Sequence, residues 1–424
     1  MAARGKKGTV MPISKLTIKP VDYMYGAILV RNIGIGIQNL VIARLLYNAT
    51  HSAVDFGLVL VLENLIVTSL QLFAGPLVDG GRQKRIMATA DVLTGAIICV
   101  ASMSLTQQTV FQWIVAAVVV MSITKPFFSS AAFAIGPAIA PGETLIRYNS
   151  FSVVMIQVGQ IIGVVCAGIF LGHFGSTPTF FLNGLAYIMS AGLIGMTRIP
   201  VIEAAPDSGE KQRLKFFQGW GEFVEHLQID RGLMWQLILV NVNFLLVLFV
   251  NVALVPIVAV DFHGNPYWLS ILDGSFAVGA FFSSSLIASF ITRWATRRTV
   301  LVGLSVQVMA FVGLALGGGR LQMGIFLLSM LSIGMGNTIS LSAFMTSLQT
   351  RTPPVMRGRT AAASKTVLAI LSMILIPLVT QVQTLSLQYG ILLSAGIGLL
   401  FIVIILLLEH PKFVGNHLFN EPMS

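Results

Sequence analysis

The chain alternates long apolar runs with short polar stretches. About 20 apolar residues in a helix cross the ~30 Å hydrocarbon core of a bilayer. Runs of this length predict about twelve helices, near residues 21–46, 54–78, 86–106, 110–138, 146–172, 178–197, 233–258, 267–291, 299–318, 322–347, 361–384 and 387–408. The pattern therefore predicts an all-α membrane protein with 12 transmembrane helices.

One long hydrophilic stretch divides this pattern into two sets of six helices. We expect a basic N-terminus (1–20), an N-terminal half (21–197), a linker (198–232), a C-terminal half (233–408) and a tail (409–424). Apolar side chains recur among the charges of the linker, which predicts an amphipathic helix on the membrane surface. These side chains are Leu214, Phe217, Phe223, Val224 and Leu227. Alternatively, this segment is only a tether between the two halves.

The net charge of +10 comes from basic residues at alternate helix ends. All but four of the 26 Lys and Arg lie in the termini, in the loops after even-numbered helices or beside them; the exceptions are Arg31, Arg44, Lys125 and Arg320. Basic loops resist translocation, so we expect both termini in the cytoplasm and the chain in the inner (cytoplasmic) membrane. The bilayer explains this charge better than nucleic acid, which we do not expect as a partner.

The sequence shows no motif of an enzyme. It lacks a phosphate-binding loop, a His-Glu-x-x-His pair and a Gly-x-Ser-x-Gly elbow. Cys99 and Cys166 lie far apart in apolar runs, which indicates neither a disulfide nor a metal site. No short apolar segment with a cleavage site follows the basic N-terminus, so we expect no cleaved signal peptide. We predict no catalysis, no cofactor and no metal.

Charged residues inside the predicted helices indicate a functional site. A charge near the bilayer centre costs roughly 2.5–3.5 kcal/mol on insertion scales, so it needs a partner or a water-filled cavity. Arg31 and Glu63 lie on antiparallel helices near the midplane, which allows an ion pair. That pair is either a substrate or proton site or a structural lock. Polar neighbours extend the candidate site, namely Asn32, Gln38, Asn39 and Asn64.

Two further charges have alternative interpretations. Lys125 either faces a cavity, where it meets an anionic ligand or Glu63, or extends to the cytoplasmic interface. Asp273 is either a proton site or gate, or a solvated acid near a helix end.

The turn after the second predicted helix carries the pattern Gly-x-x-x-Asp-x-x-Arg-x-Lys-Arg. It resembles the loop between helices 2 and 3 of the major facilitator superfamily, through Gly75, Asp79, Gly81, Arg82, Lys84 and Arg85. The resemblance implies a conformational role for this turn, and Asp79 is placed to meet a helix N-terminus or one of the nearby basic groups. Alternatively, the turn is only a basic loop that fixes the topology. Residues 292–298 occupy the same place in the second half without the acid, which indicates a degenerate repeat. The family has two six-helix halves with the solute between them near the midplane.

Other stretches resemble the enterobactin-exporter and macrolide-efflux branch of that family. They are residues 29–33, 140–143, 181–187 and 348–353, with Arg357-Gly358-Arg359 after them. The fifth helix, with Gly159, Gly163 and Gly168, resembles the antiporter motif of exporters, but Val164 replaces its proline and Ala167 a glycine. Alternatively, these glycines only permit close helix packing.

The resemblance implies a secondary active transporter that moves a small amphipathic organic solute, siderophore-like or drug-like. We expect proton-coupled export by alternating access in a functional monomer, with Glu63 taking the proton and Arg31 and Lys125 holding the solute. One alternative is an importer of a siderophore, iron or an iron chelate. Another is a non-transporting scaffold or sensor, which the polar groups at the midplane disfavour.

Overall fold

The computed structural model describes residues 20–50, 53–106, 108–197, 212–262, 267–289, 296–317 and 322–408. All regular structure in these ranges is helical. The N-terminal half has α1 (Pro20–Thr50), α2 (Ala53–Asp79), α3 (Gln83–Ser104), α4 (Val110–Ile139), α5 (Thr144–His173) and α6 (Ser176–Met196). The linker has α7 (Gln212–Ile229). The C-terminal half has α8 (Arg231–Leu239), α9 (Asn241–Asp261), α10 (Tyr267–Ser289), α11 (Thr296–Leu316), α12 (Gln322–Arg351), α13 (Arg357–Leu385) and α14 (Leu387–Leu408).

Ten segments in the described ranges are long and apolar enough to cross a membrane. One of them joins α8 and α9, which are separated only at Val240. The helices α2 and α10 fall outside this set, but their 27 and 23 residues are long enough to span a bilayer. They also occupy the second position in each half. The predicted residues 1–19, 292–295 and 409–424 lie outside the described part.

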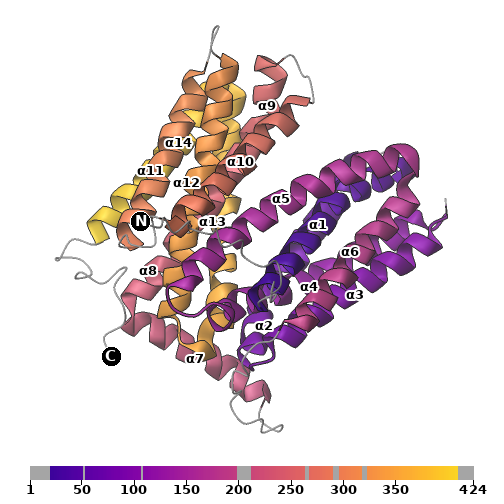
Figure 1. Cartoon of the computed structure of the whole chain (residues 1–424), viewed down its shortest axis with the longest axis horizontal. Coiled ribbons are helices and arrows are strands. Elements are labelled where there is room, and N and C mark those ends of the chain that lie inside the picture. The colour runs from indigo at the N-terminus through magenta and orange to yellow at the C-terminus, as the bar shows by residue number, and fades with distance from the viewer. Residues whose placement is uncertain are drawn as a thin grey trace, which may run out of the picture.

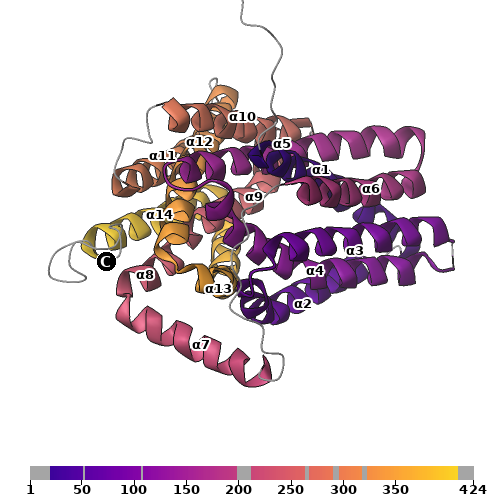
Figure 2. The ribbon, with the colours of Figure 1, turned by 60° about the horizontal axis from the view of Figure 1, so that its bottom comes forward.

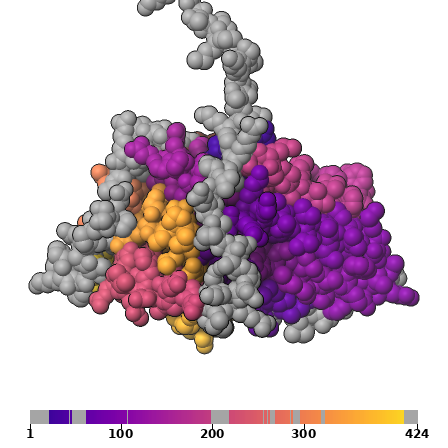
Figure 3. Space-filling view, turned by 90° about the horizontal axis from the view of Figure 1, so that it is seen from below, coloured from indigo at the N-terminus to yellow at the C-terminus, as the bar shows by residue number. Residues whose placement is uncertain are grey.

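The two halves form separate bundles that meet at one end. Figure 1 shows α1 to α6 and α9 to α14 as bundles that join around α2, α8 and α13 and diverge away from there. In the view from below, the purple N-terminal half lies beside the pink and orange surface of the C-terminal half (Figure 3). We call this junction the basic end; it includes Arg82, Lys84, Arg85, Arg147, Arg351, Arg357 and Arg359. Contacts of α2 and α4 with α13, and of α5 with α10 and α12, join the halves.

Helix α7 packs on protein through part of its apolar face. It runs below α8 and α13 towards the end of α2 (Figure 2). Phe223 is only 1% exposed and belongs to the core of the C-terminal half, where Trp220 and Leu227 also pack. Val224 remains 49% exposed. The predicted amphipathic helix exists, but the prediction that its apolar face lies on the membrane is wrong for Phe223, because the core covers it.

Glycines on α5 bring it close to α1. A Cβ on Gly159 would lie 2.7 Å from the Leu29 carbonyl oxygen, and one on Gly163 would lie 2.9 Å from Gly36 Cα and overlap the Ile33 carbonyl oxygen. Around Gly168 there is no atom within 4 Å of such a Cβ. Close helix packing therefore explains Gly159 and Gly163, but not Gly168.

This difference gives a matched test of packing. We expect Gly163→Ala to lower the melting temperature of the purified protein, since overpacking a helix contact costs typically 1–3 kcal/mol. Gly168→Ala adds the same methyl group where there is space and should melt like the wild type. Equal melting of the two variants would contradict the close α1–α5 contact.

Candidate functional site

A cavity of about 320 Å³ lies between the two halves. Helices α1, α4 and α5 line it on one side, and α9, α12 and α13 on the other. Its wall is mainly aromatic and aliphatic, with Phe128, Phe133 and Phe244 among the largest side chains. Arg31 and Lys365 are its charged residues, so the described lining contains no carboxylate.

Hydrogen bonds between the halves form the floor of this cavity at the basic end. Asn149 Nδ2 on α5 donates to Thr346 Oγ1 (2.9 Å) and Gln349 Oε1 (2.8 Å) on α12. Gln349 Nε2 donates in turn to the Phe133 carbonyl oxygen at 2.8 Å. Asn149 and Gln349 are 8% and 3% exposed, so the halves are tightly joined below the cavity.

A second cavity of about 510 Å³ follows the first along the same axis, farther from the basic end. On α5 the first cavity is lined up to Ile156, whereas the second begins at Gln157. Asp273 on α10 lines this second cavity, so the structure places it away from Arg31. Gln160 Nε2, from the second cavity, donates to Oδ1 of Asn32, from the first, at 3.4 Å.

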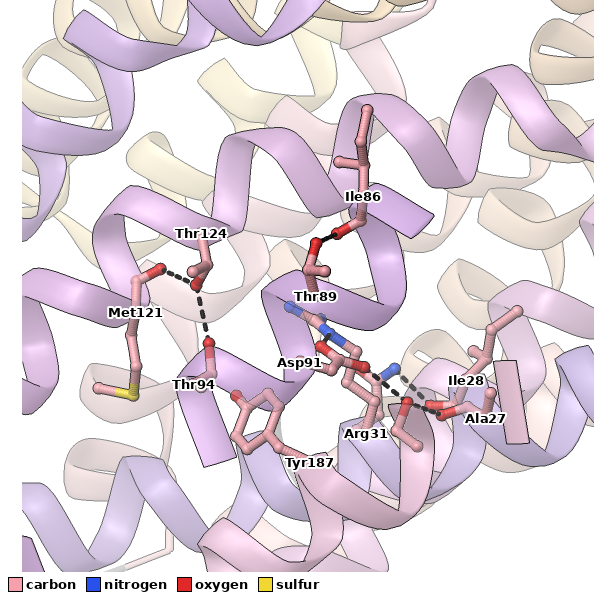
Figure 4. Close-up of polar contacts among 12 residues, drawn as sticks. Ala27, Ile28, Arg31, Ile86, Thr89, Asp91, Thr94, Met121, Thr124 and Tyr187 are labelled. Atoms are coloured by element: carbon pink, nitrogen blue, oxygen red, sulfur yellow. Dashed lines mark hydrogen bonds and ion pairs between the residues drawn. The ribbon is translucent and has the colours of Figure 1, made fainter. Parts of the chain in front are cut away.

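The buried charge next to Arg31 is Asp91 on α3. Arg31 Nε donates to Asp91 Oδ1 at 3.0 Å, and the two side chains are 15% and 1% exposed. Ser190 Oγ on α6 donates to Asp91 Oδ2 at 2.7 Å. Figure 4 shows Asp91 held between Arg31 and α6. The ion pair between Arg31 and Glu63 that the sequence allowed is therefore wrong, because Arg31 pairs with Asp91.

Two geometric facts explain this correction. Glu63 lies 16 residues from the basic end of α2, whereas Arg31 lies 11 residues into α1. At 1.5 Å per residue their heights differ by roughly 7 Å. Moreover, α1 packs mainly against α5 and α6 and only sparsely against α2. Asp91 lies eight residues into α3, which begins at Gln83. The sequence predicts that this helix begins at residue 86, which places Asp91 nearer to a helix end.

Aromatic rings complete the surroundings of Arg31. Its guanidinium carbon lies 3.7 Å from the centroid of Phe128 and 5.6 Å from that of Tyr187. Tyr187 Oη donates to Gln38 Oε1 at 2.9 Å, which joins Gln38 to the same group. Of the other predicted polar residues, Asn32 is buried and bonds to the Ile28 carbonyl oxygen, while Asn39 and Asn64 are exposed.

Lys125 contacts Glu63, one of the two partners considered for it. Its Nζ donates to Glu63 Oε1 at 2.9 Å, and the side chains are 58% and 26% exposed. Lys125 lies four residues before Ser129, which lines the first cavity, so both occupy one face of α4. The pair is thus far more accessible than the Arg31–Asp91 pair.

Lys365 on α13 is a cavity residue that the sequence analysis missed. It lies eight residues into the helix, and its Nζ is 4.0 Å from the Phe244 ring centroid. The apolar run predicts a helix start at residue 361, which makes Lys365 one of the basic residues beside a helix end. Helix α13 begins at Arg357, so Arg357-Gly358-Arg359 forms its first turn rather than a loop. The position of Lys365, eight residues into this helix, could have indicated from the sequence that its charge lies inside the protein.

Asp79 joins the two halves at the basic end. It accepts hydrogen bonds from the Gly358 amide (2.5 Å), the Arg359 amide (3.3 Å) and Arg359 Nε (2.8 Å). Asp79 thus meets the N-terminus of α13, one of the two expected kinds of partner. Its basic partner, Arg359, lies in the first turn of the same helix, 280 residues along the chain, and is not one of the basic residues near Asp79 in the sequence. The two side chains are 5% and 11% exposed, and Arg359 Nη1 also donates to the Gly219 carbonyl oxygen of α7.

The remaining residues of the turn act locally. A Cβ on Gly75 would lie 2.9 Å from Arg359 Cα, so glycine permits the close approach of α2 and α13. Gly81 has φ of 80°, which favours glycine. Lys84 Nζ donates to the carbonyl oxygens of Gly195 (2.7 Å) and Thr197 (2.8 Å) at the end of α6. Arg82 and Arg85 are exposed.

Another ion pair at the basic end lies within the C-terminal half. Arg351 Nε and Nη2 donate to Asp230 Oδ2 and Oδ1 at 2.7 and 2.5 Å. Burial acts to raise the pKa of Asp230, but hydrogen bonds from Arg351 and the Leu233 amide outweigh it and lower this pKa. The carboxylate therefore remains ionised and ties the start of α8 to the end of α12. No three His, Cys, Asp or Glu in the described ranges gather into a metal site.

Comparison with known proteins agrees with this architecture. The profile of the Major Facilitator Superfamily matches residues 24–377. Over 300 residues the chain is 25% identical to macrolide efflux protein A of Enterococcus faecalis, covering 70% of this chain and 91% of that protein. The protein of the same name from Streptococcus pyogenes is 24% identical over 300 residues, covering 70% and 72%.

Solved structures resemble the chain in fold. A bacterial homologue of the iron transporter ferroportin in an outward-facing state has a TM-score of 0.72 at 15% identity, covering 92% of this chain and 99% of that one. The transporter FucP in its outward conformation has a TM-score of 0.71 at 15% identity, covering 92% and 98%. The family profile spans most of the helices, and the predicted all-α membrane fold is confirmed. The chain belongs to the Major Facilitator Superfamily.

Proposed function

We propose that this transporter exports a small amphipathic organic solute, drug-like or siderophore-like, across the inner membrane in exchange for protons. The observation that supports it most is the largely apolar cavity between the halves, which carries cationic groups and is closed at the basic end. Alternating access then requires only that the halves separate at this end and meet at the other. A scaffold or sensor has no need of such a cavity.

The direction rests on the relatives that are named for macrolide efflux. Basic loops are retained on the cytoplasmic side, so the basic end faces the cytoplasm, with both termini there. The state described here then faces outward, with Asp79 and Arg359 holding the cytoplasmic side closed. Each monomer contains a complete cavity and is sufficient for transport.

Glu63 is the proton carrier in this proposal. Its side chain is 26% exposed and its partner Lys125 is 58% exposed, so this carboxylate is far more accessible than that of Asp91. Asp91 is 1% exposed and held by Arg31 and Ser190, which suits a structural role. Protonation of Glu63 releases Lys125 to hold the solute beside Arg31, and deprotonation restores the pair.

Transport into everted membrane vesicles tests the function. With an imposed proton gradient, we expect uptake of at least one of two radiolabelled probes, a cationic macrolide or an anionic catecholate siderophore, to exceed uptake without the gradient. Glu63→Gln should abolish the part driven by the gradient but retain exchange of the solute down its own gradient, because the cavity remains. Glu222→Gln removes a carboxylate that is 66% exposed and should transport like the wild type. Uptake only into right-side-out vesicles would indicate import, and absence of all solute movement would support the scaffold.

A further inference from the structure

Lys365 places a positive charge in the cavity with no carboxylate beside it. Within the described residues, no Asp or Glu oxygen lies within ion-pair distance of its Nζ. Its close neighbour is the Phe244 ring, whose centroid lies 4.0 Å from Nζ. A partly buried ammonium normally has a partner or open water, so this arrangement leaves room for an anion.

The described residues of the opposite wall do not supply a negatively charged side chain to neutralise Lys365. Arg31 faces the cavity from α1, but Asp91 neutralises it from the side of α3, and Asp91 is not a cavity residue. No Asp or Glu belongs to the described lining. The charges of the Arg31–Asp91 pair cancel, so Lys365 gives this cavity a net positive charge.

An unused hydrogen-bonding group lies in the same cavity. Ser342 on α12 is fully buried, lines the cavity, and its Oγ has no hydrogen-bond partner within the described residues. A hydroxyl can donate to an acidic oxygen. The cavity thus offers an ammonium and a hydroxyl from the C-terminal half, with aromatic rings from both halves around them.

We propose that the transported solute is an organic anion with an acidic group that lies against Lys365 and Ser342. Its apolar body packs between Phe128, Phe133 and Phe244, and a volume of about 320 Å³ suits a body of roughly two fused rings. An anion restores neutrality in the cavity, whereas a protonated amine meets the repulsion of Lys365. This inference rests on the proposed solute site and specifies the charge of its ligand.

Three naphthalene probes of similar shape test the sign of that charge. They are 2-naphthylacetate (an anion), 2-(2-naphthyl)ethanol (neutral) and 2-(2-naphthyl)ethylamine (a cation), titrated by calorimetry into the full-length protein in a neutral detergent. We expect the acetate to bind at least tenfold more tightly than the amine. Lys365→Met should remove this preference, while Lys365→Arg retains the charge and the preference. Arg44→Gln, which removes an exposed positive charge on α1 outside the cavity, should bind like the wild type.

The outcomes separate this inference from the proposed function. Equal binding of the three probes by the wild type, binding of none, or an unchanged preference in Lys365→Met with a wild-type melting temperature would each overturn the anion site. If Lys365→Met fails to fold, loss of the preference in Lys365→Arg would overturn it equally. Export itself is judged by the vesicle assay, so transport of a solute without charge preference would leave the proposed function in place.

Discussion

Asp91→Asn is expected to destabilise the N-terminal half strongly. The substitution removes the negative charge but leaves Arg31, which is 15% exposed, without a counter-ion. Removing one partner of a buried pair costs about 3–5 kcal/mol, because the other charge stays buried and uncompensated. We expect a lower yield of membrane-inserted protein and a lower melting temperature in detergent.

The double variant Arg31→Gln with Asp91→Asn separates charge from other effects. Both charges are then absent, so stability should recover towards that of the wild type. Glu63→Gln is the matched control within the same half, because its partner Lys125 is 58% exposed and accessible pairs contribute about 0–1 kcal/mol. If Asp91→Asn melts like the wild type, the Arg31–Asp91 pair does not stabilise this half.

Asp79→Asn is expected to open the basic end and to reduce transport at least tenfold. The carboxylate accepts bonds from Arg359 Nε at 2.8 Å and from the Gly358 amide at 2.5 Å, and each bond to a charged group contributes about 1.5–3 kcal/mol. Weakening two such bonds changes the ratio of closed to open states by more than tenfold, since about 1.4 kcal/mol is one factor of ten. Asparagine retains the shape of the side chain but not its charge.

Cysteine labelling measures this opening. Ala361, on α13, is 6% exposed and lines the cavity, so a cysteine there is covered while the basic end is closed. In a background with Cys99 and Cys166 replaced by serine, Asp79→Asn should increase labelling of Ala361→Cys from the basic side. Glu222→Gln is the control, because Glu222 lies 3.9 Å from Arg359 and is 66% exposed. Unchanged labelling and transport in Asp79→Asn would show that the α2–α13 contact does not control closure.

The sequence by itself determined the class of protein. Long apolar runs require helices in a bilayer, and one polar linker separates two sets of them, so the all-α membrane fold followed from local pattern. The turn after the second predicted helix also indicated that Asp79 meets a helix N-terminus or a nearby basic group; the helix N-terminus is present, but the basic partner Arg359 lies 280 residues away. The membrane fold could be inferred because hydropathy depends on residues close together in the chain.

Only the tertiary structure decided which charges are partners. Spacing along a helix gives the height of Arg31, but its partner depends on how α1 is rotated and which helices it contacts. Gly36, Gly159 and Gly163 bring α1 against α5, and Arg31 then reaches Asp91 rather than Glu63. Likewise, the start of α13 at Arg357 places Lys365 inside the cavity. Rotation and helix contacts arise from the packing of all helices together, so the pattern of any single helix does not contain them.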